Sequence, residues 1–288
     1  MYINPHKVAV ILSTYNGQKF VGQQIRSILS QTYRDITLYI RDDGSKDNTI
    51  EVIRNETNEY DNVVLFEQSK NLGSRDSFLY MTEMIDSAYY MFSDQDDVWM
   101  PDKIQKSVEA LQEIEKSHPD KPIIVHTDLC LVDRDLKVIS ESYWKYKKYP
   151  VDIDHKFELL CHFNDITGCA MIFNHKAVEV SKPFFHVPAP KRIYHDALIG
   201  LLVAKNKGII FPLHQQTIYF RRHGGNETNP LTSTRGFLYK PLTVVNYIKD
   251  QYGRYQFNNQ FGYGSFAKFL YYKCITKIYQ AIWKIKSA

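Results

Sequence analysis

The sequence contains few cysteines, no long apolar run and little net charge. Its four cysteines stand far apart, without the Cys-x-x-Cys spacing of a zinc site: Cys130, Cys161, Cys169 and Cys274. We therefore expect buried thiols in a reducing compartment. Because no stretch of about 18 apolar residues is present, no segment is expected to span a bilayer.

The N-terminus also lacks the apolar core and the cleavage site of a signal peptide, which predicts a cytoplasmic location. A net charge of +4 is too small to indicate nucleic-acid binding across the whole surface. Hydrophobic residues make up 44% of the 288 residues and charged residues 24%, as in ordinary folded proteins. That length accommodates one large α/β domain, alone or with a small appendage.

Short β-branched runs alternate with helical patterns in the first part of the chain. Strands are predicted at residues 8–12, 37–41, 63–66 and 89–92. Strands that alternate with helices form a mostly parallel sheet, and ligands bind beyond the carboxyl ends of such strands. Those ends read STYNG (13–17), DDGS (42–45) and SDQDD (93–97). Polar segments that meet at one rim of the sheet predict a nucleotide-sized binding site.

The second half of the chain is less regular. Strands are predicted at 123–126, 129–132, 208–211 and 217–220, and helices at 101–116, 156–162 and 196–205. The helix at 196–205 begins at Asp196, which is also a favourable N-cap residue.

The acidic segment ends a hydrophobic strand with several carboxylates. Asp94 and Asp96 stand at i and i+2, so both could face one cation, and their oxygens suit Mg²⁺ or Mn²⁺. A solvated acidic loop is the alternative. In the same way Asp42 could accept a hydrogen bond from a pyrimidine ring while Gly44 permits close approach, or the pair could form an ordinary turn.

Three stretches taken together indicate a protein family more specifically than any single motif does. They are VAVILSTYNGQKFVGQQIRSILSQTYRDITLYIRDDGSKDNT, KNLGSRDSF and FSDQDDVWMPDKI. In motif order and spacing they closely resemble family-2 glycosyltransferases of the GT-A fold, and most closely the bacterial rhamnosyltransferase-type members that build cell-surface polysaccharides. The resemblance implies an α/β fold with a Rossmann-like, mostly parallel central sheet flanked by helices. It implies a catalytic domain over residues 1–235 (nucleotide-binding half 1–100, acceptor half 101–235) and a helical extension over 236–288.

The resemblance also implies roles for individual residues at the donor site. The residues implied to contact the nucleotide are Thr14, Tyr15, Asn16, Asp42, Ser45, Asn71, Arg75 and Asp94. Among these, Asp42 would accept a hydrogen bond from the base. Asp96 would bind the Mg²⁺ or Mn²⁺ that bridges the diphosphate, with Asp94 beside it. Asp97 would either cap the next helix or support the metal ligands.

Later motifs match the same family. YHDALIG stands where the family carries an acidic pair, here His195-Asp196, which implies that Asp196 is the catalytic base and that His195 lies on the acceptor side. TIYFRRHGGN resembles a Tyr-Arg-x-His-Gly segment. It implies that His223 binds the metal or the diphosphate, and that Arg221 or Arg222 offsets phosphate charge.

DITGCAMIF stands at the acceptor-side loop, with Thr167, Gly168 and Cys169 as the implied acceptor-side residues. We expect Cys169 to be a small buried residue, because sugar transfer of this type needs no thiol nucleophile.

The implied function is inverting, metal-dependent transfer of a sugar from a nucleoside diphosphate donor to a growing, lipid-linked cell-surface polysaccharide. The favoured donor is dTDP-rhamnose. A UDP-hexose is the alternative, since thymidine and uridine present similar base edges. A non-catalytic nucleotide-sugar-binding protein is a second alternative. A nucleotidyltransferase would be expected to have a glycine-rich basic loop after the first strand, and STYNG is not one.

The C-terminal segment places apolar residues at helical spacing with lysines among them. The apolar positions are Phe266, Phe269, Leu270, Ile275, Ile278, Ile282 and Ile285. Such a helix suits an anionic membrane surface, which would place the protein at the inner face of the cell membrane. Packing of the same stripe on the catalytic domain, or on a second subunit in a homodimer, remains open, because an amphipathic pattern does not distinguish these partners.

Overall fold

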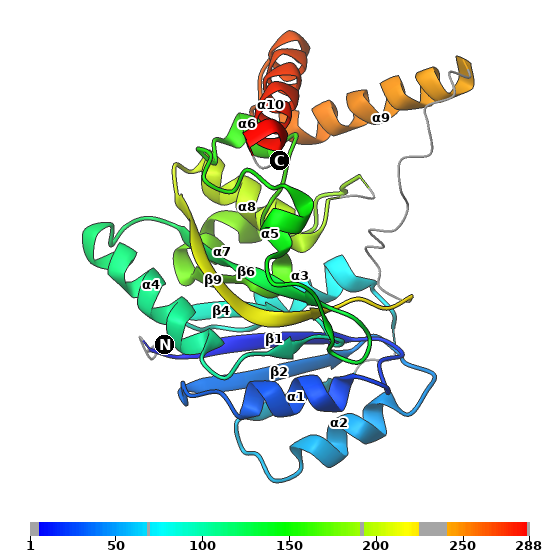
Figure 1. Cartoon of the computed structure of the whole chain (residues 1–288), viewed down its shortest axis with the longest axis vertical. Helices are drawn as coiled ribbons and strands as arrows, with labels where there is room; N and C mark the ends of the chain where they lie inside the picture. The colour runs from blue at the N-terminus through cyan, green and yellow to red at the C-terminus, as the bar shows by residue number, and fades with distance from the viewer. Residues whose placement is uncertain (1–5, 68–69, 191–192, 225–240, 287–288) are drawn as a thin grey trace.

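Nine strands from the described residues form one mixed sheet at the centre of the protein (Figure 1). The computed structural model describes residues 6–67, 70–190, 193–224 and 241–286. The strands are β1 Val8–Thr14, β2 Ile36–Asp42, β3 Val63–Glu67, β4 Tyr89–Ser93, β5 Val98–Trp99, β6 Ile123–Val132, β7 Val138–Ser140, β8 Met171–Asn174 and β9 Ile209–Arg221. Their order across the sheet is β3-β2-β1-β4-β8-β6-β9-β5, and β7 pairs with β6.

The direction of the strands confirms the predicted mostly parallel, Rossmann-like sheet. β3, β2, β1 and β4 are all parallel, and β6 is parallel to β9. β8 runs antiparallel to both β4 and β6, and β5 and β7 also pair antiparallel. Because β8 lies between β4 and β6, it joins the two halves of the chain into one continuous sheet.

Helices cover both faces of this sheet, and two long helices follow at the C-terminal end (Figure 1). The α-helices are α1 Val21–Leu29, α2 Thr49–Thr57, α3 Ser74–Met84, α4 Lys103–Ser117, α5 Tyr143–Lys147, α6 Phe157–Leu160, α7 His175–Ser181, α8 His195–Lys205, α9 Pro241–Asn259 and α10 Phe266–Lys286. Two short 3₁₀ turns are η1 Gly168–Ala170 and η2 Lys182–Phe184.

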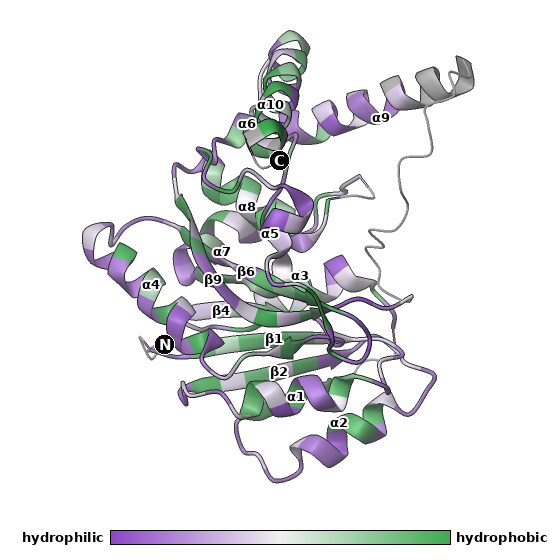
Figure 2. Cartoon of the chain, viewed as in Figure 1, coloured by the Kyte–Doolittle hydropathy of each residue, from purple (hydrophilic) through white to green (hydrophobic). Residues whose placement is uncertain are grey.

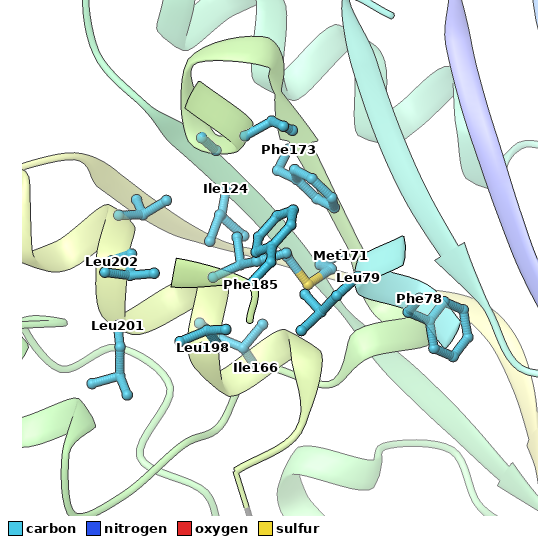
Figure 3. Packing of buried hydrophobic residues seen from close by; sticks show 14 of the residues in the cluster. Phe78, Leu79, Ile124, Ile166, Met171, Phe173, Phe185, Leu198, Leu201 and Leu202 are labelled. Atoms are coloured by element: carbon cyan, nitrogen blue, oxygen red, sulfur yellow. The ribbon is translucent and has the colours of Figure 1, made fainter. Parts of the chain in front are cut away.

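Strand β1 shows how the sequence builds the core on both faces. Ala9 and Ile11 pack in the cluster formed with α3, α7 and α8, which Figure 3 shows from close by. Val8, Val10 and Leu12 pack in the cluster formed with α1 and α4. Successive side chains of a strand point to opposite faces, so a strand covered on both faces reads as an unbroken apolar run. Burial of each such side chain contributes about 1.5–3 kcal/mol.

Two pairs of predicted strands are single strands in the structure. The segments 123–126 and 129–132 are both part of β6, and the segments 208–211 and 217–220 are both part of β9. Polar residues interrupt the apolar pattern in each case, but the ladder between β6 and β9 continues through them with shifts of register near Asp128. The predicted helix at 156–162 is shorter, as α6, and helices α5 and α7 were not predicted.

The C-terminal helices divide into a packed part and an exposed part. At the start of α10, Phe269 is buried and its ring lies 4.3 Å from that of His162, while Lys268 pairs with Glu158 at 2.7 Å. Later residues of α10 are exposed, and Figure 2 shows apolar positions along this helix. The expected boundary between residues 235 and 236 lies outside the described residues.

The structure also bears on the expectations about membrane spans and buried cysteines. Within the described residues, no helix is long and apolar enough to cross a membrane. All four cysteines are free, and Cys130, Cys161 and Cys169 are buried as expected. Cys274, on α10, is exposed instead.

Candidate active site

The ends of the parallel strands meet at one rim, as predicted. Thr14 is aligned with Asp42, and Leu12 with Ser93, so the carboxyl ends of β1, β2 and β4 lie side by side. A cavity of about 680 Å³ opens at this rim. The predicted site residues that line it are Thr14, Tyr15, Asn71, Asp94, Asp96, Thr167, Gly168, His195 and Asp196. The fold thus brings donor-side and acceptor-side segments into one space.

Gln95 connects two of these segments. Its carboxamide accepts a hydrogen bond from the backbone N–H of Tyr15 at 2.9 Å and donates one to the carbonyl of the same residue at 3.0 Å. A Cβ at Gly17 would overlap with this carboxamide, so the glycine allows Gln95 to keep this position. Gln95 therefore fixes the loop after β1 against the acidic loop after β4.

The Asp42 carboxylate has a different place from the one expected. Its oxygens accept hydrogen bonds from the Thr14 hydroxyl at 2.9 Å and the Ser45 hydroxyl at 2.6 Å. The backbone N–H groups of Gly44 and Ser45 donate to it at 3.0 and 2.8 Å. Asp42 is buried and is not among the described residues that line the cavity. With these donors around it, Asp42 shapes the turn rather than facing a ligand.

The neighbouring Asp43 lines the cavity instead. Its carboxylate pairs with the buried guanidinium of Arg41 and accepts from the backbone N–H groups of Leu72 and Gly73 at 2.8 and 2.7 Å. Sequence analysis assigned Asp42 of the DDGS motif to the nucleotide, whereas Asp43 is the member of the pair that lines the cavity. Adjacent residues at a strand end point in opposite directions, and the motif alone does not show which one faces the ligand.

Asn16 and Ser45 organise the loops beside the cavity. Asn16 adopts a φ of +50°, in the left-handed region that asparagine tolerates. Its backbone N–H donates to the Ser45 hydroxyl at 2.8 Å, and its side-chain oxygen accepts from the backbone N–H of Lys46 at 2.9 Å. Asn16 lines a second, adjoining cavity, whereas Ser45 supports the turn from behind.

Asn71 and Arg75 follow β3, but only one of them lines the first cavity. Asn71 lines the first cavity and donates from its side chain to the carbonyl of Asp43 at 2.8 Å. Arg75 pairs with Asp76 at 2.7 Å and donates to the carbonyl of Val187 at 3.2 Å. It is not among the described cavity-lining residues, so the structure brings Asn71 but not Arg75 to this cavity.

The acidic loop separates its carboxylates into two environments. Asp94 and Asp96 line the first cavity, and Asp96 also lines the second. Asp96 Oδ2 lies 2.7 Å from His223 Nε2, so the end of β4 meets the residues that follow β9. Asp96 and His223 therefore meet beside both cavities, while Asp94 lines the first cavity only.

Asp97 is fully buried beneath this loop. Its Oδ1 accepts from the backbone N–H of Arg221 at 3.0 Å, which ties the acidic loop to β9. Burial raises the pKa of Asp97 well above its usual value, and the carboxylates of Asp96 and Asp94 raise it further. Asp97 does not cap the next helix, which begins at Lys103.

Cys169 lies in the same buried region as Asp97. Burial, followed by the Asp97 and Asp94 carboxylates, raises the pKa of the Cys169 thiol well above its usual value. Burial lowers the pKa of Lys103 nearby to about 8, and its amino group lies 4.7 Å from the centre of the Trp99 ring. Cys169 is a neutral core thiol and is not among the described residues that line the cavity, in agreement with its expected burial.

The donor atoms around Asp96 fit a divalent cation. Asp96 supplies a carboxylate oxygen and His223 an imidazole nitrogen 2.7 Å away; Mg²⁺ accepts the carboxylate, and Mn²⁺ accepts both. Asp94 lines the same cavity as Asp96, but among the described residues its ligand atoms do not fall within 4.8 Å of those of both Asp96 and His223. Asp94, Asp97 and Cys169 instead have ligand atoms within 4.8 Å of one another. That second group fits less well, because the thiol is neutral and soft and Asp97 is turned into the core.

The two arginines that were expected to contact the diphosphate, Arg221 and Arg222, line neither of the two described cavities. Arg221 is 3% exposed, and its guanidinium donates to the backbone carbonyls of Asp96 at 2.8 Å and Arg134 at 2.6 Å. Arg222 donates to the Tyr146 hydroxyl at 3.0 Å. Neither is among the described residues that line either cavity, so Arg221 holds the loops in place rather than facing a ligand.

Other cationic side chains line the second cavity. The second cavity measures about 640 Å³ and includes Lys19, Arg134 and His223 next to Asp96. Sequence analysis missed Lys19 and Arg134, because an isolated basic residue in a loop carries no pattern that separates it from an ordinary surface charge.

Asp196 lines the first cavity together with the donor-side segments. Its Oδ2 accepts from the backbone N–H of Gly168 at 3.1 Å and its Oδ1 from that of Ala197 at 2.6 Å. Burial raises the pKa of Asp196 to about 6. A carboxylate with a pKa near neutrality that faces a cavity is suited to take up a proton.

His195 supports the wall beside Asp196. Its ring packs on Phe78 and Phe92, with ring centres 4.2 and 4.7 Å away, and burial lowers the pKa of His195 to about 3. A Cβ at Gly168 would lie 2.8 Å from His195 Nε2, so the glycine allows this packing. The neutral imidazole thus takes the place of the first acid of the expected acidic pair.

Comparison with known sequences identifies the family. Residues 9–180 match the family model described as Glycosyl transferase family 2. The chain is 29% identical over 224 residues to the uncharacterized glycosyltransferase alr2836 of Nostoc sp., which covers 76% of this chain and 66% of that protein. It is 33% identical over 105 residues to the dTDP-rhamnosyl transferase RfbG of Shigella flexneri, covering 35% of this chain and 36% of that one. The chain thus spans at most about two thirds of these relatives.

Solved structures show the same fold. S. aureus TarS 1–349 in complex with UDP-GlcNAc matches 76% of this chain and 60% of its own, with a TM-score of 0.54 and 15% identity. The mannosyltransferase PcManGT from Pyrobaculum calidifontis, in complex with GDP-Man and Mn²⁺, matches 74% of this chain and 56% of its own, with a TM-score of 0.53 and 14% identity. At these identities the likeness shows the fold alone. By its sequence match and its GT-A-like sheet, the chain belongs to glycosyl transferase family 2.

Proposed function

We propose that the protein transfers a sugar from a nucleoside diphosphate donor to a saccharide acceptor, with inversion at the anomeric carbon. One observation carries the proposal: Asp43, Asp94 and Asp96 line the same cavity as Asp196. A binding protein would need the first group but not a further carboxyl group with a raised pKa in the same cavity.

The donor side is suited to a pyrimidine nucleotide. Asp43 can accept from the ring N–H of thymine or uracil, and Tyr15 is 44% exposed at the mouth of the cavity, where it can pack against the base or ribose. The diphosphate would lie near Asp96, where Lys19 and Arg134 supply positive charge.

We favour dTDP-rhamnose as the donor, in view of the name of the Shigella relative. A UDP-hexose is the alternative, and the UDP-GlcNAc bound by TarS is consistent with it.

The proposed reaction is a single displacement. Asp196 accepts the proton of the acceptor hydroxyl as that oxygen bonds to the anomeric carbon. The bond from that carbon to the diphosphate oxygen breaks at the same time, and the nucleoside diphosphate leaves with the electron pair. The backbone N–H groups of Gly168 and Ala197 hold the Asp196 carboxylate in place during proton transfer. Mg²⁺ or Mn²⁺ held by Asp96 and His223, with Asp94 beside them, would supply positive charge to offset that of the leaving group.

The acceptor side of the cavity is aromatic. Tyr143, Tyr149, Tyr194 and Phe220 line it, and such rings pack against the apolar faces of sugars while the tyrosine hydroxyls can form hydrogen bonds. This lining supports a saccharide acceptor.

We further propose that the acceptor is lipid-linked and that the reaction takes place at the inner face of the cell membrane. On α10, the exposed fractions of Ile278, Ile282 and Ile285 are 58%, 47% and 78%, and Lys277 is exposed beside them. This exposed face suits an anionic membrane surface. A second subunit of a homodimer could cover the same face.

A donor panel tests the proposed function. The purified chain is incubated with dTDP-rhamnose and with UDP-hexoses, with Mg²⁺ or Mn²⁺ and saccharide acceptors, and release of nucleoside diphosphate is followed. We expect release that requires acceptor and metal, and a product of inverted anomeric configuration. Tight donor binding without release from any sugar would support a nucleotide-sugar-binding protein instead, and a product of retained configuration would contradict the single displacement.

A further inference from the structure

A second cluster of polar side chains lies outside both cavities. It consists of His126 on β6, His155 in the segment before α6, and Asp165 in the segment before η1. Each residue offers one ligand atom, and these atoms lie within 4.8 Å of one another. The residues come from three separate parts of the chain. Asp165 is the first residue of the DITGCAMIF segment, whereas His126 and His155 belong to none of the motifs of the active site.

The cluster is buried. His126 is fully buried, Asp165 is 1% exposed, and the side chain of His155 is 6% exposed. His155 Nε2 lies 3.1 and 3.0 Å from the two carboxylate oxygens of Asp165. Neighbouring ligand atoms of a tetrahedral Zn²⁺ with bonds of about 2.0–2.1 Å are roughly 3.3 Å apart, so this pair is already near coordination spacing.

His126 supplies a second and independent observation. Neither of its ring nitrogens has a hydrogen-bond partner among the described residues, although the side chain is fully buried. Burial of an imidazole without a partner is unfavourable, and buried polar groups normally have one. Burial lowers the pKa of His126 to about 4, so the ring is neutral near pH 7, and the neutral ring is the form that binds metals.

We infer that His126, His155 and Asp165 form a binding site for a zinc-class transition-metal ion, separate from the catalytic cavity. Two imidazoles and one carboxylate, with a water as fourth ligand, are a Zn²⁺ donor set. Coordination gives the buried ring of His126 a partner and balances the charge of Asp165. Mg²⁺ prefers oxygen ligands, so the proposed ion differs in class from the one expected at Asp94 and Asp96.

The position of the site gives the ion a structural role in the cavity wall. Asn164, Ile166 and Thr167 line the catalytic cavity, whereas Asp165 between them turns into the cluster. The ion would hold residues 155–165 against β6. The same wall ends at Gly168, whose backbone N–H donates to the Asp196 carboxylate. A metal ion that holds this wall in place would therefore also help to hold the proposed base in place.

Metal binding by the full-length chain tests this inference, using protein without a histidine tag. The chain is treated with a chelator and then titrated with Zn²⁺ alone in competition with a chromophoric chelator. We expect one tight equivalent in the wild type and in Asp96→Ala, and an affinity at least about tenfold lower in His155→Gln and Asp165→Asn. Wild-type affinity in these two variants, or absence of tight binding in the wild type, would overturn the inference.

A surface pair provides the matched control. His186 Nε2 lies 2.9 Å from Glu83 Oε2, so the pair resembles His155 and Asp165, but the side chain of His186 is 80% exposed. We expect His186→Gln to bind Zn²⁺ like the wild type. A loss of Zn²⁺ affinity in His186→Gln equal to that in His155→Gln would indicate nonspecific binding to histidine–carboxylate pairs and overturn the inference.

Co²⁺ provides a second measurement that does not depend on the folding of any variant. Co²⁺ bound to the wild type at this site should show the visible d–d absorption of a tetrahedral ion without a thiolate charge-transfer band, because all three protein ligands are nitrogen or oxygen. A strong thiolate band would place the ion at Cys169 instead, and a weak octahedral spectrum would also contradict the assigned site.

Discussion

His223 Nε2 lies 2.7 Å from Asp96 Oδ2, although the two residues are 127 positions apart in the chain. This contact joins the end of β4 to the residues that follow β9, at the point where the two cavities meet. Since β9 belongs to the second half of the sheet, folding of both halves is required to assemble the proposed metal site.

The first prediction concerns this metal site. Asp96→Ala and His223→Gln should each weaken metal-dependent donor binding at least about tenfold, because each removes a ligand. Calorimetry with donor nucleotide, with and without Mn²⁺, measures the effect. Asp97→Asn is the control: it keeps an oxygen for the Arg221 backbone N–H, so the metal dependence should be unchanged. Loss of metal dependence in Asp97→Asn with retention in Asp96→Ala would reverse the assignment.

The second prediction concerns the base. Asp196→Asn should lower the rate of transfer by about 10²–10⁴-fold and leave the Kd of the donor nucleotide nearly unchanged, because a general base acts on the acceptor hydroxyl. Transfer assays and nucleotide binding are measured on the same preparation. Full transfer activity in Asp196→Asn would refute the role of Asp196.

The third prediction follows from the pKa of Asp196, which burial raises to about 6. Since a base must be ionised, kcat/KM should rise about tenfold per pH unit below pH 6 and level off above it. A profile that is flat between pH 5 and 7 at constant metal saturation would argue against this group as the base.

The same pKa predicts a dependence of stability on pH. The folded state binds the Asp196 proton more tightly than the unfolded state, so its contribution to stability is present below pH about 4 and is lost as the pH rises through 6. The free energy of unfolding of the wild type should therefore fall by about 1–3 kcal/mol relative to Asp196→Asn between pH 4 and 7. Denaturant unfolding at both pH values measures the difference, and a constant difference would contradict burial of an ionisable group at this position.

The fourth prediction concerns the link between Gln95 and Tyr15. Gly17→Ala should displace the Gln95 carboxamide and cost about 1–3 kcal/mol of stability, because the added methyl group overlaps with it. In a Gln95→Ala background the same substitution should cost much less, which a double-mutant cycle would show. Additive effects of the two substitutions would mean that the overlap does not control the loop.

The fifth prediction concerns the exposed face of α10. The triple change Ile278→Gln, Ile282→Gln and Ile285→Gln should reduce sedimentation with anionic vesicles at least about tenfold, because each isoleucine would contribute apolar burial in the interface. Val138→Gln with Ile139→Gln, which changes exposed apolar residues of β7, is the matched control. A triple variant that binds vesicles normally but changes from dimer to monomer would support the homodimer instead.

Much of the fold and of the site could be predicted from the sequence by itself. The unbroken apolar run of β1 determined a strand buried on both faces, and polar segments after three parallel strands determined a ligand site at one rim. Both follow from local periodicity and from the general geometry of parallel sheets. The resemblance to family-2 glycosyltransferases also implied that Asp94, Asp96 and Asp196 share one site, and all three line the first cavity.

Only the tertiary structure decided which member of a polar pair faces the cavity. Asp43 rather than Asp42 lines it, Asp97 turns into the core, and the guanidinium of Arg221 holds loops together. These choices depend on which donors surround each side chain once distant segments meet. Composition and residue spacing do not predict which side chain faces the cavity.

The cluster of His126, His155 and Asp165 is the clearest example of a feature that only the tertiary structure reveals. No local pattern connects the three residues, since one lies in a strand and two lie in irregular segments. Local sequence determined the strands, the helices and the rim, because neighbouring residues set backbone conformation and burial pattern. The packing of distant segments determined the partners of each buried polar group, because a buried charge or imidazole must find its partner in space rather than along the chain.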